Sequence, residues 1–231
     1  MSAYAQIRVR GTDAMSFLQG QLTNDLEQIG ADAVQFAAWC NPKGRVIAFL
    51  RVSRDGDAFR LALPAALGET VVERLLRFRF RAKVELVLEA VENVALGLSD
   101  GAGGADAGWL RRNLLAGIPD IGPGQSEKFT PHMLNLDRLD ALSLDKGCYT
   151  GQEIVARTHY RGATKRRMLR FRSNAPVAAG DAVSSGDRRI GEVVNAIGLD
   201  LLAVVPVDGA GDALSAGGAL LTRESLPYAL D

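Results

Sequence analysis

The spacing of apolar residues changes twice between residues 33 and 98, and this change restricts the folds that are open to the chain. Helical spacing covers 65–80, where Leu67, Val71 and Leu75 recur every four residues. Residues 83–98 return to strand character. Strand-like segments separated by turns come before the helix, at residues 33–40, 45–52 and 59–63. This order predicts an α+β fold in which helices back an antiparallel sheet.

Shorter elements are expected on either side of this region. Thr12 or Asp13 is suited to cap a short helix near the N-terminus. Residues 99–108 are rich in glycine and alanine, which predicts a flexible connection. Ordered structure is expected again over 109–118, and a short helical pattern covers 134–144.

The last part of the chain has a different character. After Pro176, short strand-like segments alternate with glycine turns, at residues 182–184, 190–197, 201–207 and 219–222. Strands of this length indicate a small β-barrel or sandwich. We therefore divide the chain into an α+β part over 1–173 and a C-terminal β-barrel over 174–231.

Composition describes an ordinary globular protein without a charge bias. The 231 residues include 27 Lys or Arg and 27 Asp or Glu, and 47% of the residues are hydrophobic. The N-terminus lacks the apolar core of a signal peptide, and no apolar run approaches the roughly 20 residues that span a bilayer. These features predict a cytoplasmic protein that does not engage membranes.

Cysteine and histidine are too scarce for a conventional metal site. The chain contains two cysteines, Cys40 and Cys148, two histidines, and no CxxC pair. Four cysteine ligands for an iron–sulfur cluster are therefore not available within one subunit. Cys40 ends an apolar strand, where a small buried thiol is the common occurrence. No resident metal is expected, and Cys148 is the thiol that needs an explanation.

Cys148 lies in the octapeptide KGCYTGQE, which begins at Lys146. Thr150 and Glu153 have the spacing of a capping box, so a helix is expected to begin at Gly151. A thiol just before a helix N-terminus and beside a lysine is favoured as the reactive thiolate. The competing interpretation is that Cys148 is a small buried residue in an ordinary glycine turn.

Basic residues cluster immediately after this motif. No acidic residue occurs between Glu153 and Asp181. The basic residues of 157–172 are Arg157, Arg161, Lys165, Arg166, Arg167, Arg170 and Arg172. In a neutral chain this asymmetry indicates an anionic ligand or partner, and RNA is one candidate. The alternative is a strand whose arginines simply point into water.

Four sequence blocks together resemble a known family. They are FLQGQLTNDL at 17–26, WCNPKGR at 39–45, AGIP at 116–119 and KGCYTGQEIVAR at 146–157. Through these blocks the chain is similar to the YgfZ folate-binding proteins, which are related to the glycine-cleavage aminomethyltransferases. The resemblance covers nearly the whole chain, and its KGCYxGQE block is the most specific.

The resemblance implies an aminomethyltransferase-like (GcvT-like) fold, with antiparallel sheets and helices around a channel that binds tetrahydrofolate. It also implies a role in assembling or repairing iron–sulfur clusters, including those of enzymes that modify tRNA, with iron–sulfur client proteins as partners. By the same resemblance, Cys148 and Lys146 are the chemically active pair. The folate-binding residues that it implies are Tyr149, Gly151, Gln152, Glu153, Arg157, Arg161 and Asn24.

Departures from the family pattern bear on activity. Residues 45–48 supply no carboxylate where aminomethyltransferases carry an aspartate, so glycine cleavage is not expected. Leu115 occupies a position where many relatives have a glutamate that pairs with the pterin. A folate-dependent one-carbon transferase is an alternative that needs a carboxylate from elsewhere in the chain. The other alternative is an RNA-binding module that uses 157–172, although these arginines also suit the glutamate tail of a folate.

Overall fold

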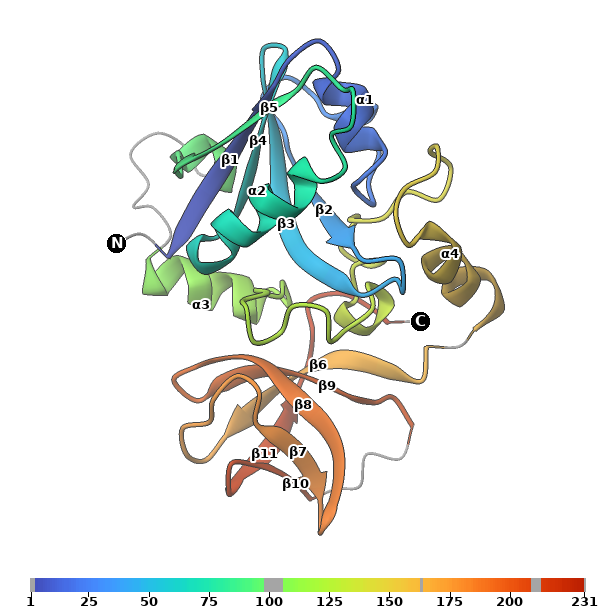
Figure 1. The fold of residues 1–231 in the computed structure, drawn as a ribbon. Helices are drawn as coiled ribbons and strands as arrows, with labels where there is room; N and C mark the ends of the chain where they lie inside the picture. The colour runs from blue at the N-terminus through green and yellow to red at the C-terminus, as the bar shows by residue number, and fades with distance from the viewer. Residues whose placement is uncertain (1–2, 98–105, 163, 209–212, 231) are drawn as a thin grey trace.

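The computed structural model describes residues 3–97, 106–162, 164–208 and 213–230, which form two β-structures joined by helices and loops (Figure 1). The first is a five-stranded antiparallel sheet, and the second is a closed barrel. This architecture confirms the predicted α+β class and decides between a barrel and a sandwich in favour of the barrel.

One strand of the sheet has no counterpart among the predicted elements. The sheet consists of β1 (Tyr4–Arg10), β2 (Val34–Cys40), β3 (Val46–Asp55), β4 (Ala58–Pro64) and β5 (Glu85–Ala90), in the spatial order β2-β3-β4-β1-β5. Short turns join β2 to β3 and β3 to β4, as the sequence predicts. The unpredicted strand is β1, where Ile7 faces Leu61 on β4 and Leu88 on β5. Both partners lie far along the chain, so no local turn signal marks β1.

The predicted amphipathic helix covers the sheet but is shorter than expected. It consists of η2 (Ala65–Leu67) and α2 (Gly68–Leu76), and it ends before Phe80, a residue that is 87% exposed and has a positive φ. Val71 and Leu75 of α2 share a buried cluster with Ile7 of β1. The smaller elements of this region are α1 (Ala14–Gln19), η1 (Leu26–Gln28) and η3 (Asn93–Leu96).

Two longer helices follow the sheet, α3 (Ala107–Leu115) and α4 (Gln152–Arg161). Figure 1 shows α3 between the sheet and the barrel, well apart from α4. The Asp106 carboxylate caps α3 by accepting the Trp109 N–H at 2.7 Å. Most of the connection predicted as flexible, 99–105, lies outside the residues that the structure describes.

The helix predicted over 134–144 is wrong. A single 3-10 turn, η4 (His132–Leu134), is followed by turns in which Asn135 and Asp140 have positive φ angles of 58° and 50°. A left-handed residue ends a helix. The Asn135 side chain supports this conformation by donating to the Met168 carbonyl oxygen at 2.7 Å.

The barrel takes in a strand that precedes the predicted division at residue 173. Its strands are β6 (Arg166–Ser173), β7 (Ala182–Ser185), β8 (Arg188–Ile197), β9 (Asp200–Pro206), β10 (Leu214–Ala216) and β11 (Ala219–Glu224), closed in the order β10-β11-β6-β9-β8-β7. Leu169 and Phe171 of β6 belong to the cluster that fills the barrel. We therefore assign β6 to the barrel.

The sheet and the barrel share an apolar core. One buried cluster contains Ala38 and Phe49 of the sheet, Leu114 of α3, and Met168 and Val194 of the barrel. Burial of this kind fixes the relative position of the elements that contribute to it. Within the described ranges, no helix has the length and apolar character that a membrane-crossing helix requires.

Candidate functional site

The cysteine motif forms the loop that leads into α4. The helix begins at Gln152, and Gly151 precedes it with a φ of 84°. A Cβ atom on Gly151 would lie 2.5 Å from the Asn41 carbonyl oxygen, so this position requires glycine. The predicted capping box is wrong, because Thr150 is not the N-cap residue. Instead, the Gln152 Oε1 atom accepts the Tyr149 N–H at 3.3 Å.

Lys146 fastens this motif to the loop that follows α1. Its Nζ atom donates to the carbonyl oxygens of Leu22 at 2.8 Å and Asn24 at 2.7 Å, and to Gln19 Oε1 at 3.3 Å. Burial lowers the pKa of Lys146 to about 8, against the pull of two nearby carboxylates. The lysine therefore joins the KGCYTGQE block to the FLQGQLTNDL block.

The two cysteines lie in opposite environments. Cys148 is exposed and has no hydrogen bond to the part of the chain that the structure describes. Its exposure contradicts the interpretation of Cys148 as a small buried residue. Cys40 is fully buried, and burial raises the pKa of its thiol to about 12. The structure thus confirms Cys40 as a buried thiol and leaves Cys148 open to a partner.

The other residues implied by the resemblance do not meet at one opening. Tyr149 is buried, and its hydroxyl has no hydrogen-bond partner among the described residues. The Asn24 side chain donates to two backbone carbonyls, at 2.8 and 2.6 Å, and so supports the fold. Glu153 and Arg157 pair with each other at 2.6 Å on the exposed side of α4. Arg161 ends α4, and its side chain lies outside what the structure describes. Their role in folate binding stays a prediction.

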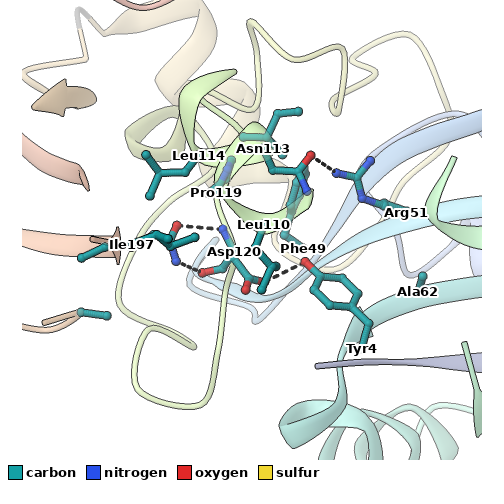
Figure 2. A pocket seen from close by; sticks show the side chains of 14 residues that line it. Tyr4, Phe49, Arg51, Ala62, Leu110, Asn113, Leu114, Pro119, Asp120 and Ile197 are labelled. Carbon is teal, nitrogen blue, oxygen red and sulfur yellow. Dashed lines mark hydrogen bonds between the residues drawn. The ribbon is translucent and has the colours of Figure 1, made fainter. Parts of the chain in front are cut away.

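A cavity of about 230 Å³ opens where the sheet, α3 and the barrel meet (Figure 2). Its walls include apolar side chains such as Phe49, Leu110 and Ile118. None of the residues implied by the resemblance lines it. Its main polar side chains are Tyr4, Arg51, Asn113, Asp120 and Asn195.

Asp120 supplies a carboxylate to this cavity. The Tyr4 hydroxyl donates to its Oδ1 atom at 2.8 Å, while Oδ2 has no hydrogen bond to any described residue. Asn195 of β8 holds the Asp120 backbone, accepting its N–H at 2.8 Å and donating to its carbonyl oxygen at 2.6 Å. Burial raises the pKa of Asp120, although Tyr4 and Arg51 oppose this effect. A carboxylate oxygen that is free in a largely apolar cavity suits a ligand with N–H groups.

Arg51 forms a rigid cationic wall of the same cavity. Its guanidinium lies 4.7 Å from the ring centroid of Phe36 and 4.8 Å from that of Trp109. It also donates to Asn113 Oδ1 at 3.0 Å. Burial lowers the pKa of Arg51, and the Tyr4 and Asp120 side chains oppose this shift. Aromatic contacts and the hydrogen bond together restrict the guanidinium to one orientation.

Reasoning from the sequence missed Asp120, although a signal for it was present. The residue follows directly after the AGIP block, whereas the family pattern places its carboxylates at 45–48 and at the position of Leu115. An acidic residue just beyond a glycine–proline turn is well placed to face a site formed by that turn. The cavity therefore has a carboxylate from elsewhere in the chain, which the transferase alternative requires.

The basic run of 157–172 is divided among several environments. Lys165 and Arg166 are exposed and have no acidic partner among the described residues. Four of its arginines pair with acidic side chains: Arg157 with Glu153, Arg167 with Asp137, Arg170 with Glu224 and Arg172 with Asp200. These pairs reduce the positive charge that the sequence indicates.

Comparison with known proteins connects this geometry to a family. No protein-family model matches the chain. The tRNA-modifying protein YgfZ of Enterobacter sp. (strain 638) is 30% identical over 261 residues, which cover 85% of this chain and 80% of that protein. The tRNA-modifying protein YgfZ of Sodalis glossinidius is 28% identical, with 98% of this chain and 91% of that protein covered.

A solved structure supports the fold independently. The glycine cleavage system aminomethyltransferase T from Bartonella henselae matches with a TM-score of 0.69 at 16% identity, and the match covers 98% of this chain and 84% of that one. This likeness confirms the aminomethyltransferase-like fold. Together with the sequence similarity over most of its length, it shows that the chain belongs to the YgfZ family.

Proposed function

We propose that the protein binds a reduced folate in the cavity beside Asp120 and supports tRNA modification by iron–sulfur enzymes, which it contacts through Cys148. The names of its relatives support the tRNA part. The folate part is carried by one observation: the Asp120 Oδ2 atom, in a cavity with largely apolar walls, accepts no hydrogen bond from any residue that the structure describes.

The lining of the cavity fits the pterin end of tetrahydrofolate. A pterin presents an amino group and a ring N–H side by side, and a carboxylate accepts hydrogen bonds from both. Phe49, Leu110 and Ile118 supply apolar walls for the ring. The volume of about 230 Å³ is below the roughly 300–1,000 Å³ of pockets that enclose drug-sized ligands. We therefore expect the ring system inside and the glutamate tail outside.

The residues of the chain act on the folate by positioning it. Asp120 orients the ring, Tyr4 holds one oxygen of that carboxylate, and Asn195 fixes the Asp120 backbone. When bound, the folate supplies one-carbon chemistry. Leu115, at the position where many relatives have a glutamate, is a partly buried apolar residue packed against the shared core. In this proposal Asp120 supplies the carboxylate that binds the pterin.

Cys148 acts at the surface in this proposal. Its thiol is exposed and does not line the folate cavity, so it can reach a cluster carried by a client protein and serve as a transient ligand. Lys146 holds the loop that presents the thiol. The two sites contribute separately, one to the small molecule and one to the client.

Titration of purified protein with tetrahydrofolate tests the folate site. Asp120→Asn keeps the shape of the side chain but removes the charge, and we expect the affinity to fall by at least about tenfold. Glu73→Gln removes an exposed carboxylate on α2 and should leave the affinity unchanged. Equal affinities for the wild type and Asp120→Asn would rule out this site.

Complementation tests the surface site. In cells that lack the native protein, Cys148→Ala should be produced in folded form but fail to restore the activity of an iron–sulfur tRNA-modifying enzyme. Asp120→Asn in the same assay shows whether folate binding is also required. Full restoration by Cys148→Ala would remove the thiol from the function.

A folate-dependent transferase is the second candidate, and Asp120 is the observation that favours it. Its raised pKa and its position in the cavity suit a group that exchanges a proton with a bound ring. Turnover of methylene-tetrahydrofolate by the purified protein, lost in Asp120→Asn, is the expected result for an enzyme. Absence of turnover across a panel of amines and thiols would favour the binding protein.

A further inference from the structure

His132 is an unusual polar residue that neither site described above uses. It is only 2% exposed, and neither of its ring nitrogens has a hydrogen-bond partner among the described residues. Buried polar atoms without a partner are destabilising, and in native proteins they usually face water, an ion or a ligand. The ring is therefore a candidate contact for water, an ion or a ligand.

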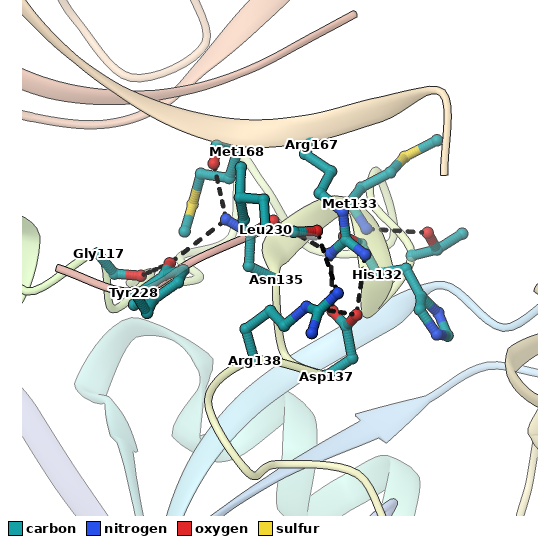
Figure 3. A network of polar contacts seen from close by, with 11 residues as sticks. Gly117, His132, Met133, Asn135, Asp137, Arg138, Arg167, Met168, Tyr228 and Leu230 are labelled. Carbon is teal, nitrogen blue, oxygen red and sulfur yellow. Dashed lines mark hydrogen bonds and ion pairs between the residues drawn. The ribbon is translucent and has the colours of Figure 1, made fainter. Parts of the chain in front are cut away.

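A second cavity, of about 460 Å³, lies against this histidine. It is lined by Asp137, Arg138, Thr158, His159 and Arg167, among other residues. The ring of His159, on α4, is 5.9 Å from the ring of His132 and tilted by 44°. Figure 3 shows His132 beside the Arg167–Asp137 pair, with no interaction drawn to its ring.

The charges around this cavity favour an anion. Arg167 donates to the two Asp137 oxygens at 2.8 and 2.9 Å, so this buried pair is neutral. Arg138 adds a second guanidinium, whose Nε atom lies 3.7 Å from Asp137 Oδ2. Among the described lining residues, one carboxylate thus faces two guanidinium groups, and their summed charge is positive before either histidine is protonated.

His132 adds a hydrogen-bond donor to this positively charged cavity. Burial lowers the pKa of His132, and the charges of Arg167 and His159 act in the same direction, against Asp137. The imidazole is therefore neutral near pH 7 and retains one N–H donor and one acceptor nitrogen. A partly protonated oxyanion can satisfy both.

We propose that this cavity binds the phosphate monoester of a nucleotide, either free or at the 5′ end of an RNA. Residues that can donate line the cavity from three elements: His132 on η4, Arg138 on the following turn, whose Nη2 also donates to the Leu230 carbonyl oxygen at 3.1 Å, and His159 on α4. Three directions suit the three terminal oxygens of a phosphate better than the two oxygens of a planar carboxylate. This inference goes beyond the proposed function and depends on neither Asp120 nor Cys148.

An exposed aromatic ring lies next to the rim of the cavity. Tyr160 is 70% exposed, and its ring makes an edge-to-face contact with His159 at 5.1 Å. Nucleic-acid bases stack on exposed aromatic side chains of this kind. A nucleotide whose phosphate lies in the cavity can therefore place its base against Tyr160.

Calorimetric titration of the full chain tests the site with four probes: inorganic phosphate, adenosine 5′-monophosphate, adenosine, and a short RNA with a 5′ phosphate. The phosphate compounds should bind saturably and adenosine should not. His132→Phe keeps a flat ring but removes both nitrogens, so the affinity should fall by at least about tenfold without loss of thermal stability. Arg138→Leu should weaken binding similarly. Arg77→Leu, on the exposed side of α2, is the matched control and should bind like the wild type.

The same titration distinguishes the source of the phosphate. Tyr160→Ala should weaken the binding of adenosine 5′-monophosphate but not the binding of inorganic phosphate. Tighter binding of the RNA than of the mononucleotide assigns the site to RNA ends, and equal binding assigns it to free nucleotides. Absence of saturable phosphate binding, or unchanged affinity in His132→Phe, overturns the proposal. If His132→Phe does not fold, unchanged affinity in both Arg138→Leu and His159→Ala overturns it.

Discussion

The Tyr4 hydroxyl donates a 2.8 Å hydrogen bond to Asp120, although 116 positions separate the two residues in the chain. Tyr4 begins β1, one of the interior strands of the sheet, whereas Asp120 lies on the loop after α3. Asn195 adds two hydrogen bonds from the barrel to the backbone of the same aspartate. The position of the cavity carboxylate therefore depends on the sheet and the barrel together.

Asp120→Asn is expected to leave stability near neutral pH unchanged or to raise it. Burial raises the pKa of Asp120 above its ordinary 3.8. Between pH 3.8 and the raised pKa, the folded protein therefore binds more protons than the unfolded chain. The contribution of Asp120 to stability is complete below 3.8 and is lost as the pH rises through the raised pKa. Denaturant unfolding on either side of this window measures it. A mutant that loses more stability at neutral than at acidic pH would contradict the assignment.

Lys146→Met is expected to destabilise the fold by about 1–3 kcal/mol, because it leaves the Leu22 and Asn24 carbonyl oxygens without their donor. Folding lowers the pKa of Lys146 from 10.5 to about 8, so the unfolded chain binds more protons between these values. The wild type should therefore gain stability over the mutant as the pH rises through that window. Chemical denaturation below and above the window measures both effects. Unchanged stability with slower alkylation of Cys148 would instead identify the lysine as an activator of the thiol.

The two glycines of the KGCYTGQE motif should respond differently to alanine. Gly151 has a φ of 84°, and an added Cβ would meet the Asn41 oxygen at 2.5 Å, so Gly151→Ala should cost more than about 1 kcal/mol of unfolding free energy. A Cβ on Gly147 meets nothing within 4 Å, so Gly147→Ala should stay within about 0.5 kcal/mol of the wild type. Thermal or urea denaturation compares them. Similar losses of unfolding free energy in both variants would show that the loop has another conformation.

Arg167→Leu should destabilise the protein by about 3–5 kcal/mol, because it removes both short hydrogen bonds of the buried Asp137 carboxylate and leaves only the Arg138 guanidinium, at 3.7 Å. Both side chains of this pair are only 10% exposed. Arg157→Leu is the matched control, since Arg157 pairs with Glu153 one turn away on the exposed side of the same helix. Losing this pair should cost less than about 0.5 kcal/mol of unfolding free energy. Equilibrium denaturation gives both values. Equal effects would mean that burial does not distinguish the two arginines.

Alkylation of the native protein should modify Cys148 and spare Cys40. The first thiol is exposed, and the second is fully buried with a raised pKa. Mass spectrometry of peptides after brief treatment with iodoacetamide, with and without denaturant, measures the two rates. Modification of Cys40 at a similar rate under native conditions would show that β2 opens readily.

The elements that the sequence predicted well are those with local signals. The strands β2 to β4 are bounded by turns with proline or glycine, and α2 has a clear helical period over Val71 and Leu75. Glycine turns separate β7 from β8, β8 from β9 and β10 from β11 in the same way. Missed elements depend on distant contacts: β1 takes its place from β4 and β5, and Asn135 ends η4 through a bond to Met168.

The candidate sites were less accessible to sequence reasoning. Cys148 is exposed, and its reactivity stays a prediction. The acceptors of Lys146 include backbone carbonyl oxygens, which no pattern of side chains encodes. Asp120, Tyr4 and Asn195 come from three separate parts of the chain and converge only in the folded protein. Proximity of this kind is a property of the tertiary structure.

The bonds from Asn195 to the Asp120 backbone have a practical consequence for dissecting the protein. A fragment that stops before β8 would keep every strand of the sheet but lose the far wall of the cavity and the anchor of its carboxylate. Truncation therefore cannot isolate the cavity with its walls intact, and point substitutions in the intact chain are the means to separate the contributions of its parts.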